Sequence, residues 1–185
     1  MTKLAKLSER VNYLSKKLAK LERKEKIMQI KENKAKRKKR AVHLFILGNI
    51  FKYAEIDNIE EETLIGYCLS FSKINPLKLE QYMTIGKQVL IEKEAERQEK
   101  AKKLKNNIVE KSKEKMNFSK KEYSRMIRLG AVFEMAKIDT VELATLIGFI
   151  LDFKNKSAVE ENNFHFDGKI FKFERDKKKK LKKEN

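Results

Sequence analysis

Three features of the sequence predict a mainly α protein, with a long N-terminal coiled-coil-like helix followed by two tandem helix-turn-helix repeats. The chain has one proline and six glycines in 185 residues, and this scarcity of helix-interrupting residues favours long helices. Apolar residues near the N-terminus recur at helical spacing. A segment of 31 residues occurs twice, which is typical of repeated supersecondary units, here αα-hairpins.

The N-terminal segment carries a heptad pattern. Its apolar residues lie 3, 4, 3, 4 and 3 positions apart, at Leu4, Leu7, Val11, Leu14, Leu18 and Leu21. This spacing forms one helical stripe that needs a partner stripe. Two interpretations stay open: the stripe meets a helix of an oligomer or partner protein, or it folds back on the chain's own core. Since no breaking residue follows, one helix is predicted from about Leu4 to Glu55.

The strongest signal is an internal repeat with an offset of 82 positions. Residues 41–71 align with residues 123–153 without a gap, and 13 of the 31 positions are identical. Three further matches extend the two units: Gly86/Gly168, Lys87/Lys169 and Glu92/Glu174. The predicted organisation is a basic heptad helix (1–40), a first helical repeat (41–94), a charged linker helix (95–122), a second helical repeat (123–176) and a lysine-rich tail (177–185).

Each repeat is predicted to hold two helices that fold against each other across a short turn. Asp57 and Asp139 are predicted N-caps of the second helix, with Glu60 and Glu142 three residues later as the other half of a capping box.

Glycines inside the predicted helices, at Gly48, Gly66, Gly130 and Gly148, cost about 1 kcal/mol each relative to alanine. A close helix crossing would offset this cost, and the alternative is that the glycines bend the helices or are simply tolerated. A third helix is predicted after Pro76. In residues 164–173, Asp-Gly between aromatic residues predicts a small β-hairpin.

The charge balance constrains the partners. Lys and Arg number 45, Asp and Glu number 27, and the net charge is +18. Such a chain attracts DNA, RNA or an anionic lipid surface without special fit, although lysine-rich helices also serve solubility alone. No apolar run approaches the roughly 18 residues of a membrane span. With one cysteine and no apolar leader, a cytoplasmic protein without a membrane partner is expected.

Residues with the chemistry of catalysis are isolated in this sequence. There is no Gly-rich phosphate loop, and His43 and His165 stand without a cluster of cysteines or carboxylates. Cys68 corresponds to Ile150 in the second repeat, which indicates core packing. We therefore predict a non-enzymatic protein with no catalytic residue, no metal and no cofactor.

Basic residues collect just before each repeat. Those predicted to contact nucleic acid are Lys34, Lys36, Arg37, Lys38, Lys39, Arg40, Lys120, Lys121, Arg125 and Arg128. Acidic residues collect at the first turn, as Glu55, Asp57, Glu60, Glu61 and Glu62. Lysine and arginine on a helical face can contact several phosphates. Because most of these residues are lysines, phosphate contacts should outweigh the reading of base edges.

The order of motifs resembles a known family. A basic helix, Leu-Gly, an apolar turn, Ile-Asp and a second helix bearing Leu-Ile-Gly lie in residues 40–71 and again in residues 125–153. This pattern resembles the small TraD-type conjugal transfer proteins of mobilisable plasmids, which are distinct from the coupling ATPase of the same name. Those proteins usually carry the motif once. The resemblance implies an accessory to a relaxase in DNA processing at a transfer origin.

The predicted function is that of an accessory nucleic-acid-binding protein of a relaxosome-type complex, with DNA favoured over RNA. The N-terminal stripe would set the oligomeric state or recruit a protein partner such as a relaxase. Two alternatives remain: an adaptor or inhibitor encoded by a mobile element, and an RNA-binding protein.

Overall fold

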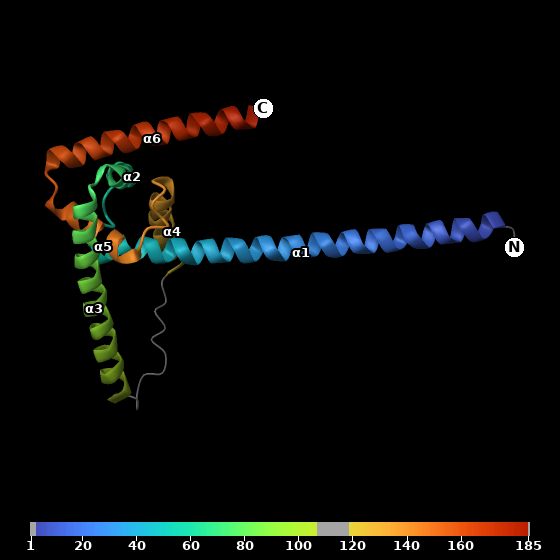
Figure 1. The fold of residues 1–185 in the computed structure, drawn as a ribbon, viewed down its shortest axis with the longest axis horizontal. Helices are drawn as coiled ribbons and strands as arrows, with labels where there is room; N and C mark the ends of the chain where they lie inside the picture. The colour runs from blue at the N-terminus through green and yellow to red at the C-terminus, as the bar shows by residue number, and fades with distance from the viewer. Residues whose placement is uncertain (1–2, 107–118, 185) are drawn as a thin grey trace. The chain divides into compact units, whose positions relative to one another are not determined.

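The structure is a computed structural model that describes residues 3–106 and 119–184, and these residues are almost entirely helical (Figure 1). The elements are α1 (Lys3–Tyr53), α2 (Glu61–Ser70), the 3₁₀ turn η1 (Phe71–Lys73), α3 (Pro76–Asn106), α4 (Lys120–Met135), α5 (Leu143–Leu151), the 3₁₀ turn η2 (Asp152–Asn155) and α6 (Ala158–Glu184). The predicted long N-terminal helix and helical hairpins are confirmed. The chain divides into two compact units, residues 1–42 and residues 43–185, and both repeats belong to the second.

One prediction for the C-terminal part is wrong. Residues 164–173 form no hairpin but lie inside α6, which also takes in the lysine run up to Glu184. The Asp-Gly pair suggested a turn, but Gly168 lies where α6 approaches the backbone of another helix. Of the predicted linker helix, residues 95–106 belong to α3 and residues 120–122 to α4, while residues 107–118 lie outside the described part of the chain.

The predicted aspartate N-caps are also wrong. The second helix of each repeat begins later, with Glu60 and Glu142 at the N-cap and no side-chain cap hydrogen bond at either position. The reason is the turn that ends the preceding helix. Glu55 and Lys137 occupy the left-handed backbone region, with φ of 58° and 59°. The residues from Asp57 and Asp139 onward are therefore still part of the connection.

A Schellman motif closes the first helix of each repeat. The amide of Ile56 donates to the carbonyl of Phe51, and that of Ile138 donates to the carbonyl of Phe133, each at 3.0 Å. The following side chain is then buried, since Ile56 and Ile138 are 5% and 6% exposed. This apolar anchor after the left-handed residue is characteristic of the motif, and it explains why Ile-Asp recurs.

Capping boxes are present at other helices. Ser119 accepts from the amide of Glu122, whose carboxylate accepts from the amide of Ser119, at 3.2 and 3.0 Å. Ser157 and Glu160 make the same pair of bonds at the start of α6, at 3.3 and 2.9 Å. The pattern Ser-x-x-Glu was readable in both segments and would have located these helix starts.

The two repeats are related by a pseudo-two-fold axis. Rings of residues 82 positions apart pack against each other in two places: those of Phe51 and Phe133 lie 4.8 Å apart, and those of Tyr67 and Phe149 lie 4.4 Å apart. Equivalent residues meet in this way only near a symmetry axis. The predicted matching buried sites are confirmed, since Leu47/Leu129, Phe51/Phe133 and Ile65/Ile147 are all buried.

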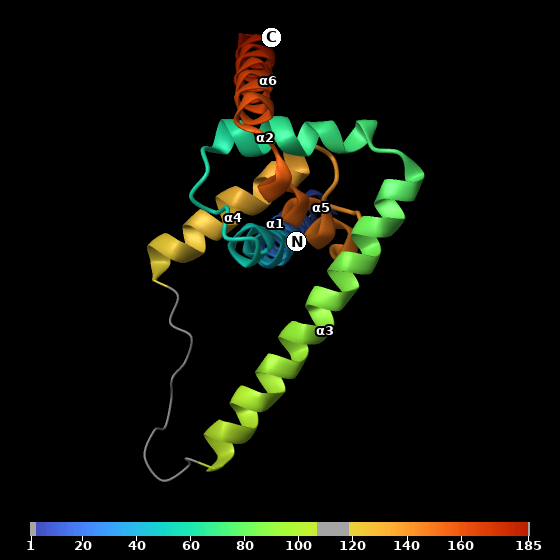
Figure 2. The same cartoon turned by 90° about the vertical axis from the view of Figure 1, so that its left-hand side faces the viewer.

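The repeats exchange their third helices. The third helix of the first repeat, α3, packs on α5 of the second repeat, and the third helix of the second repeat, α6, packs on α2 of the first (Figure 2). Consequently each repeat covers the second helix of the other, and the buried core is shared.

Glycines mark three helix crossings. They pair as Gly48 with Gly130 between α1 and α4, Gly66 with Gly168 between α2 and α6, and Gly86 with Gly148 between α3 and α5. At each crossing, a Cβ on one glycine would collide with the main-chain carbonyl oxygen four residues before the other glycine. The helices thus meet backbone to backbone, and the predicted close crossing is confirmed.

Replacing Gly86 with Ala should destabilise the fold. The new methyl group meets the backbone carbonyl of Ala144, which no rotamer change can move. We expect a cost near the upper end of overpacking effects, about 3 kcal/mol. After the roughly 1 kcal/mol gained in helix propensity, the free energy of unfolding should fall by about 2 kcal/mol in a denaturant titration.

The control is Gln88→Ala, two residues away on the exposed face of α3, which should change stability by less than about 0.5 kcal/mol. Equal stability of the two variants would contradict the close crossing.

Candidate nucleic-acid interface

The basic run on α1 is fully exposed. Residues 31–40 are helical, and each side chain is exposed. Lys36 pairs with Glu32 at 2.7 Å, but a surface pair of this kind contributes little and readily opens. Lys34, Arg37, Lys38 and Lys39 form no ion pair with another described residue. Several cationic groups on one rigid helix therefore remain available to an external anion.

The second predicted cluster divides into exposed and engaged residues. Lys120, Lys121 and Arg128 are exposed on α4. Arg125 is half-buried and donates to the main-chain carbonyl of Asp57, and its guanidinium lies 3.5 Å from the carboxylate of that residue. It therefore holds the turn of the first repeat, a role that the sequence alone did not reveal.

Pseudo-symmetry supports a structural role for Arg125. The residue 82 positions earlier is His43, and its Nε2 lies 3.2 Å from the main-chain carbonyl oxygen of Asp139. This is the equivalent contact on the other repeat. Both side chains reach from the first helix of one repeat to the turn of the other. Both therefore serve to hold the two repeats together.

Basic groups of the second repeat neutralise the acidic turn of the first. Lys154 lies 2.9 Å from the Glu55 carboxylate. Lys172 lies 2.9 Å from that of Glu62 and 3.5 Å from that of Glu61. The hydrogen bond from Lys172 lowers the pKa of Glu62. Because these carboxylates form ion pairs within the second unit, they do not offset the charge of the exposed basic run of α1.

The heptad stripe is exposed where the structure describes it. Val11, Leu14, Leu18 and Leu21 are each between 54% and 63% exposed on α1. The side chains of Leu4 and Leu7 lie outside the described part of the chain. An uncovered stripe of this length is unusual for a helix in water, because large apolar patches usually mark an interface.

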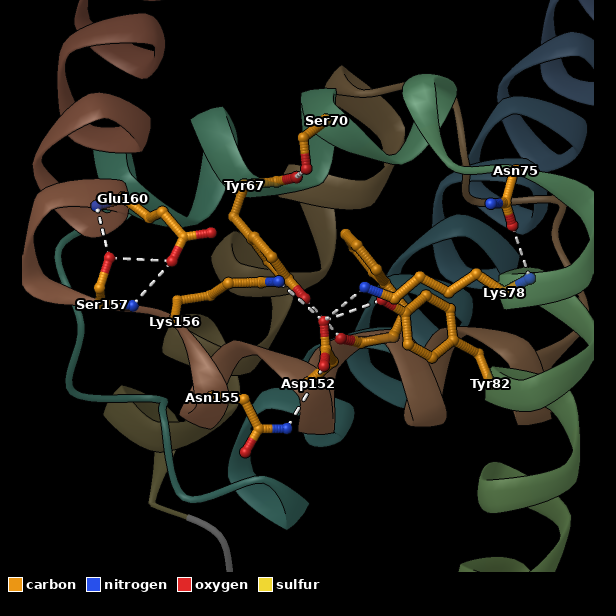
Figure 3. A network of polar contacts seen from close by, with 11 residues as sticks. Tyr67, Ser70, Asn75, Lys78, Tyr82, Asp152, Asn155, Lys156, Ser157 and Glu160 are labelled. Carbon is orange, nitrogen blue, oxygen red and sulfur yellow. Dashed lines mark hydrogen bonds and ion pairs between the residues drawn. The ribbon is translucent and has the colours of Figure 1, made fainter.

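A polar network joins the two repeats at one end of the α3/α5 interface (Figure 3). The carboxylate of Asp152 accepts from the Tyr82 hydroxyl at 2.8 Å and pairs with Lys156 at 2.9 Å and with Lys78 at 3.6 Å. Burial alone would raise the pKa of Asp152, but the hydrogen bonds from Lys156, Tyr82 and Asn155 outweigh it and lower the pKa. The carboxylate is therefore ionised and already occupied by donors.

This network breaks the symmetry between the repeats. The positions equivalent to Asp152, Tyr82 and Lys156 hold Ser70, Phe164 and Ile74. At the α2/α6 interface other residues break the symmetry. Lys172 pairs with Glu61 and Glu62, whereas the equivalent positions at the α3/α5 interface hold Leu90, Leu143 and Ala144. Pairing two identical repeats would place Leu90 against glutamates or Lys172 against apolar residues. The contacts therefore favour pairing of unlike repeats.

Cys68 lies in the core. It is 0% exposed, and burial raises the pKa of its thiol. This agrees with the packing role inferred from its counterpart Ile150, since a reactive thiolate needs access and a lowered pKa.

Among the described helices, none combines the length and apolarity that a bilayer span requires. Comparison of the chain with protein-family models, with curated proteins and with solved structures returns no match.

Replacing Asp152 with Asn should remove charged hydrogen bonds at the α3/α5 interface and lower the free energy of unfolding by about 2 kcal/mol at neutral pH. Because the pKa of Asp152 is lowered in the folded state, its contribution is complete above the unfolded value of about 3.9 and is lost as pH falls through the folded pKa. The difference between wild type and variant should therefore shrink in acid. Urea titrations across pH measure it, with Asp167→Asn on exposed α6 as the control.

Replacing Leu14 and Leu18 with Glu should test the exposed stripe. If the stripe pairs with a second helix, like charges on the seam will dissociate the assembly, and sedimentation should report a smaller species. Lys16→Glu with Lys20→Glu adds the same number of acids on another face of α1 and should leave sedimentation unchanged. Identical sedimentation of both double variants and wild type would exclude self-association through the stripe.

Proposed function

We propose that this chain is a non-enzymatic accessory protein that binds nucleic acid, with DNA favoured, in the transfer of a plasmid or another mobile element. The observation that carries this proposal is the exposed basic run of α1. Lys34 to Arg40 contains six basic residues among seven, and every one of these side chains is exposed.

The dimensions of the run suit a polyanion. Seven helical residues span about 9 Å along the helix axis, and duplex DNA carries about one charge per 1.7 Å of its axis. Several phosphates therefore lie within reach of these two turns of α1. Neutralising them releases condensed counterions, which supplies most of the free energy of sequence-independent binding.

The resemblance to small TraD-type transfer proteins supports DNA as the polymer and a relaxase complex as the setting. In this proposal, Lys120, Lys121 and Arg128 provide additional phosphate contacts in the second unit. Arg125 is left out of the proposed contact set because it is occupied at the turn.

A second candidate function rests on the exposed heptad stripe. Val11, Leu14, Leu18 and Leu21 would dock a helix of another protein, and the chain would then act as an adaptor of a mobile element. The two candidates differ in their response to salt. Binding to bare duplex DNA that falls steeply with salt supports the first, and no affinity for DNA or RNA at low salt supports the adaptor.

Replacing Lys36, Arg37, Lys38, Lys39 and Arg40 with Gln should weaken DNA binding about evenly across sequences, because phosphate contacts position a protein without reading bases. The slope of log affinity against log salt should flatten by roughly 0.9 for each phosphate that the variant no longer neutralises. Fluorescence anisotropy with a duplex at several salt concentrations measures both quantities.

The matched control replaces Lys16, Lys17, Lys20, Lys24 and Lys26 with Gln. It removes five charges from other exposed positions of α1 and should retain most of the wild-type slope. If both variants lose the same affinity, only net charge matters and the basic run is not the site.

A further inference from the structure

One face of α6 exposes large apolar side chains. Phe166, Ile170 and Phe173 are 63%, 44% and 73% exposed, and their spacing of four and three residues places them on one side of the helix. Phe164 and Phe171 of the same helix pack against the core. The exposed residues therefore belong to a face that the fold of the second unit does not use.

Lysines continue this face. Lys177 follows Phe173 by four residues, and Lys180 follows Lys177 by three, so both lie in line with the aromatic residues. Both are exposed on α6. We call Phe166, Ile170, Phe173, Lys177 and Lys180 the α6 face.

The equivalent helix of the first repeat lacks the aromatic residues and the lysines of this face. At the positions matching the α6 face, α3 has Thr84, Gln88, Ile91, Ala95 and Gln98. Both helices nevertheless make the same glycine crossing with the second helix of the other repeat. Packing in the core thus does not require two exposed phenylalanines and two lysines here, and the difference between the repeats points to a ligand of α6.

We propose that the α6 face binds single-stranded nucleic acid. This proposal rests on the proposed function and specifies the strand state of the nucleic acid at this site. Phe166 and Phe173 stack on unpaired bases, while Lys177 and Lys180 neutralise the adjoining phosphates. Rings and cations along one line are the usual combination for a single strand. In a duplex the bases are already stacked inside, so the rings have nothing to contact.

The distribution of lysines argues against a lipid surface as the ligand. A helix that lies on a membrane separates its lysines from its apolar side chains, which enter the bilayer together. On the α6 face, Lys177 and Lys180 occupy the same side as Phe173. Insertion of that side would bury both ammonium groups, whereas a polyanion lying along it satisfies them.

The test compares a fluorescent oligodeoxythymidylate of about 15 nucleotides, within the common range of single-strand sites, with a duplex of equal length. Replacing Phe166 and Phe173 with Ala in the full chain should lower single-strand affinity by at least about tenfold, because two bases no longer stack on rings. The salt slope should not change, because the variant keeps every lysine that neutralises a phosphate. Duplex affinity should also stay the same.

Two further variants make the result specific. Thr84→Ala with Ile91→Ala alters the matching positions of α3 and should leave single-strand affinity unchanged. Phe166→Leu with Phe173→Leu keeps the apolar area but removes the rings, and should lose affinity as the Ala variant does. Wild-type affinity in the Leu variant would overturn stacking and indicate docking of a protein or lipid.

The failures of the two proposals can be told apart. A wild-type protein that binds duplex and single strand with equal affinity, unaffected by either phenylalanine variant, overturns the α6 site and leaves the proposed function standing. A wild-type protein that binds neither probe at low salt overturns both.

Discussion

The architecture depends on backbone contact between helices at glycines. At each of the three crossings, a side chain as small as methyl would meet a main-chain carbonyl of the partner helix. Because all six glycines of the chain are used in this way, the cost of glycine in a helix is accepted where it brings two helices close together. The short separation then lets Phe51 pack against Phe133 and Tyr67 stack on Phe149 across the pseudo-two-fold axis. The aromatic core follows from the crossings.

Exchange of the third helices makes the two repeats interdependent. Since α3 covers α5 and α6 covers α2, neither repeat can bury its own second helix. This arrangement could in principle form between separate chains, and the side chains at the interfaces bear on that alternative. Asp152 accepts a hydrogen bond from Tyr82 across one interface, and Lys172 meets two glutamates across the other. Because the equivalent positions hold uncharged residues, like repeats would leave charges without partners, at a cost that favours the unlike pair within one chain.

Local periodicity and comparison of the sequence with itself predicted the helices and the pairs of equivalent residues. The repeat offset located the buried pairs such as Leu47 and Leu129 and implied a close crossing at the glycines. It could not show that the third helices exchange, because the same periodicity fits packing within a repeat. Asp57 was misassigned because an N-cap and a loop residue after a left-handed turn look alike without the backbone angle at Glu55. Arg125 was predicted to contact DNA because the sequence alone does not show its contact with Asp57. The two residues lie 68 positions apart, and only the tertiary fold brings them together. The candidate site on α1 follows from composition alone, while the asymmetry of α6 became interpretable only beside α3.

The division of charge explains how a compact core and a strongly basic chain coexist. The turn of the first repeat uses its acids to pair with Arg125, Lys154 and Lys172 of the second, so carboxylates and cations neutralise each other where the two repeats meet. The remaining excess of cations falls on helical segments beyond the crossings, such as residues 31–40 and residues 177–182, where each side chain stays in water. Charge there is tolerated without a partner, because solvent screens it. Residues at such exposed positions can differ without disturbing the core, so they can be suited to a ligand. The differences between α6 and α3 lie at positions of this kind.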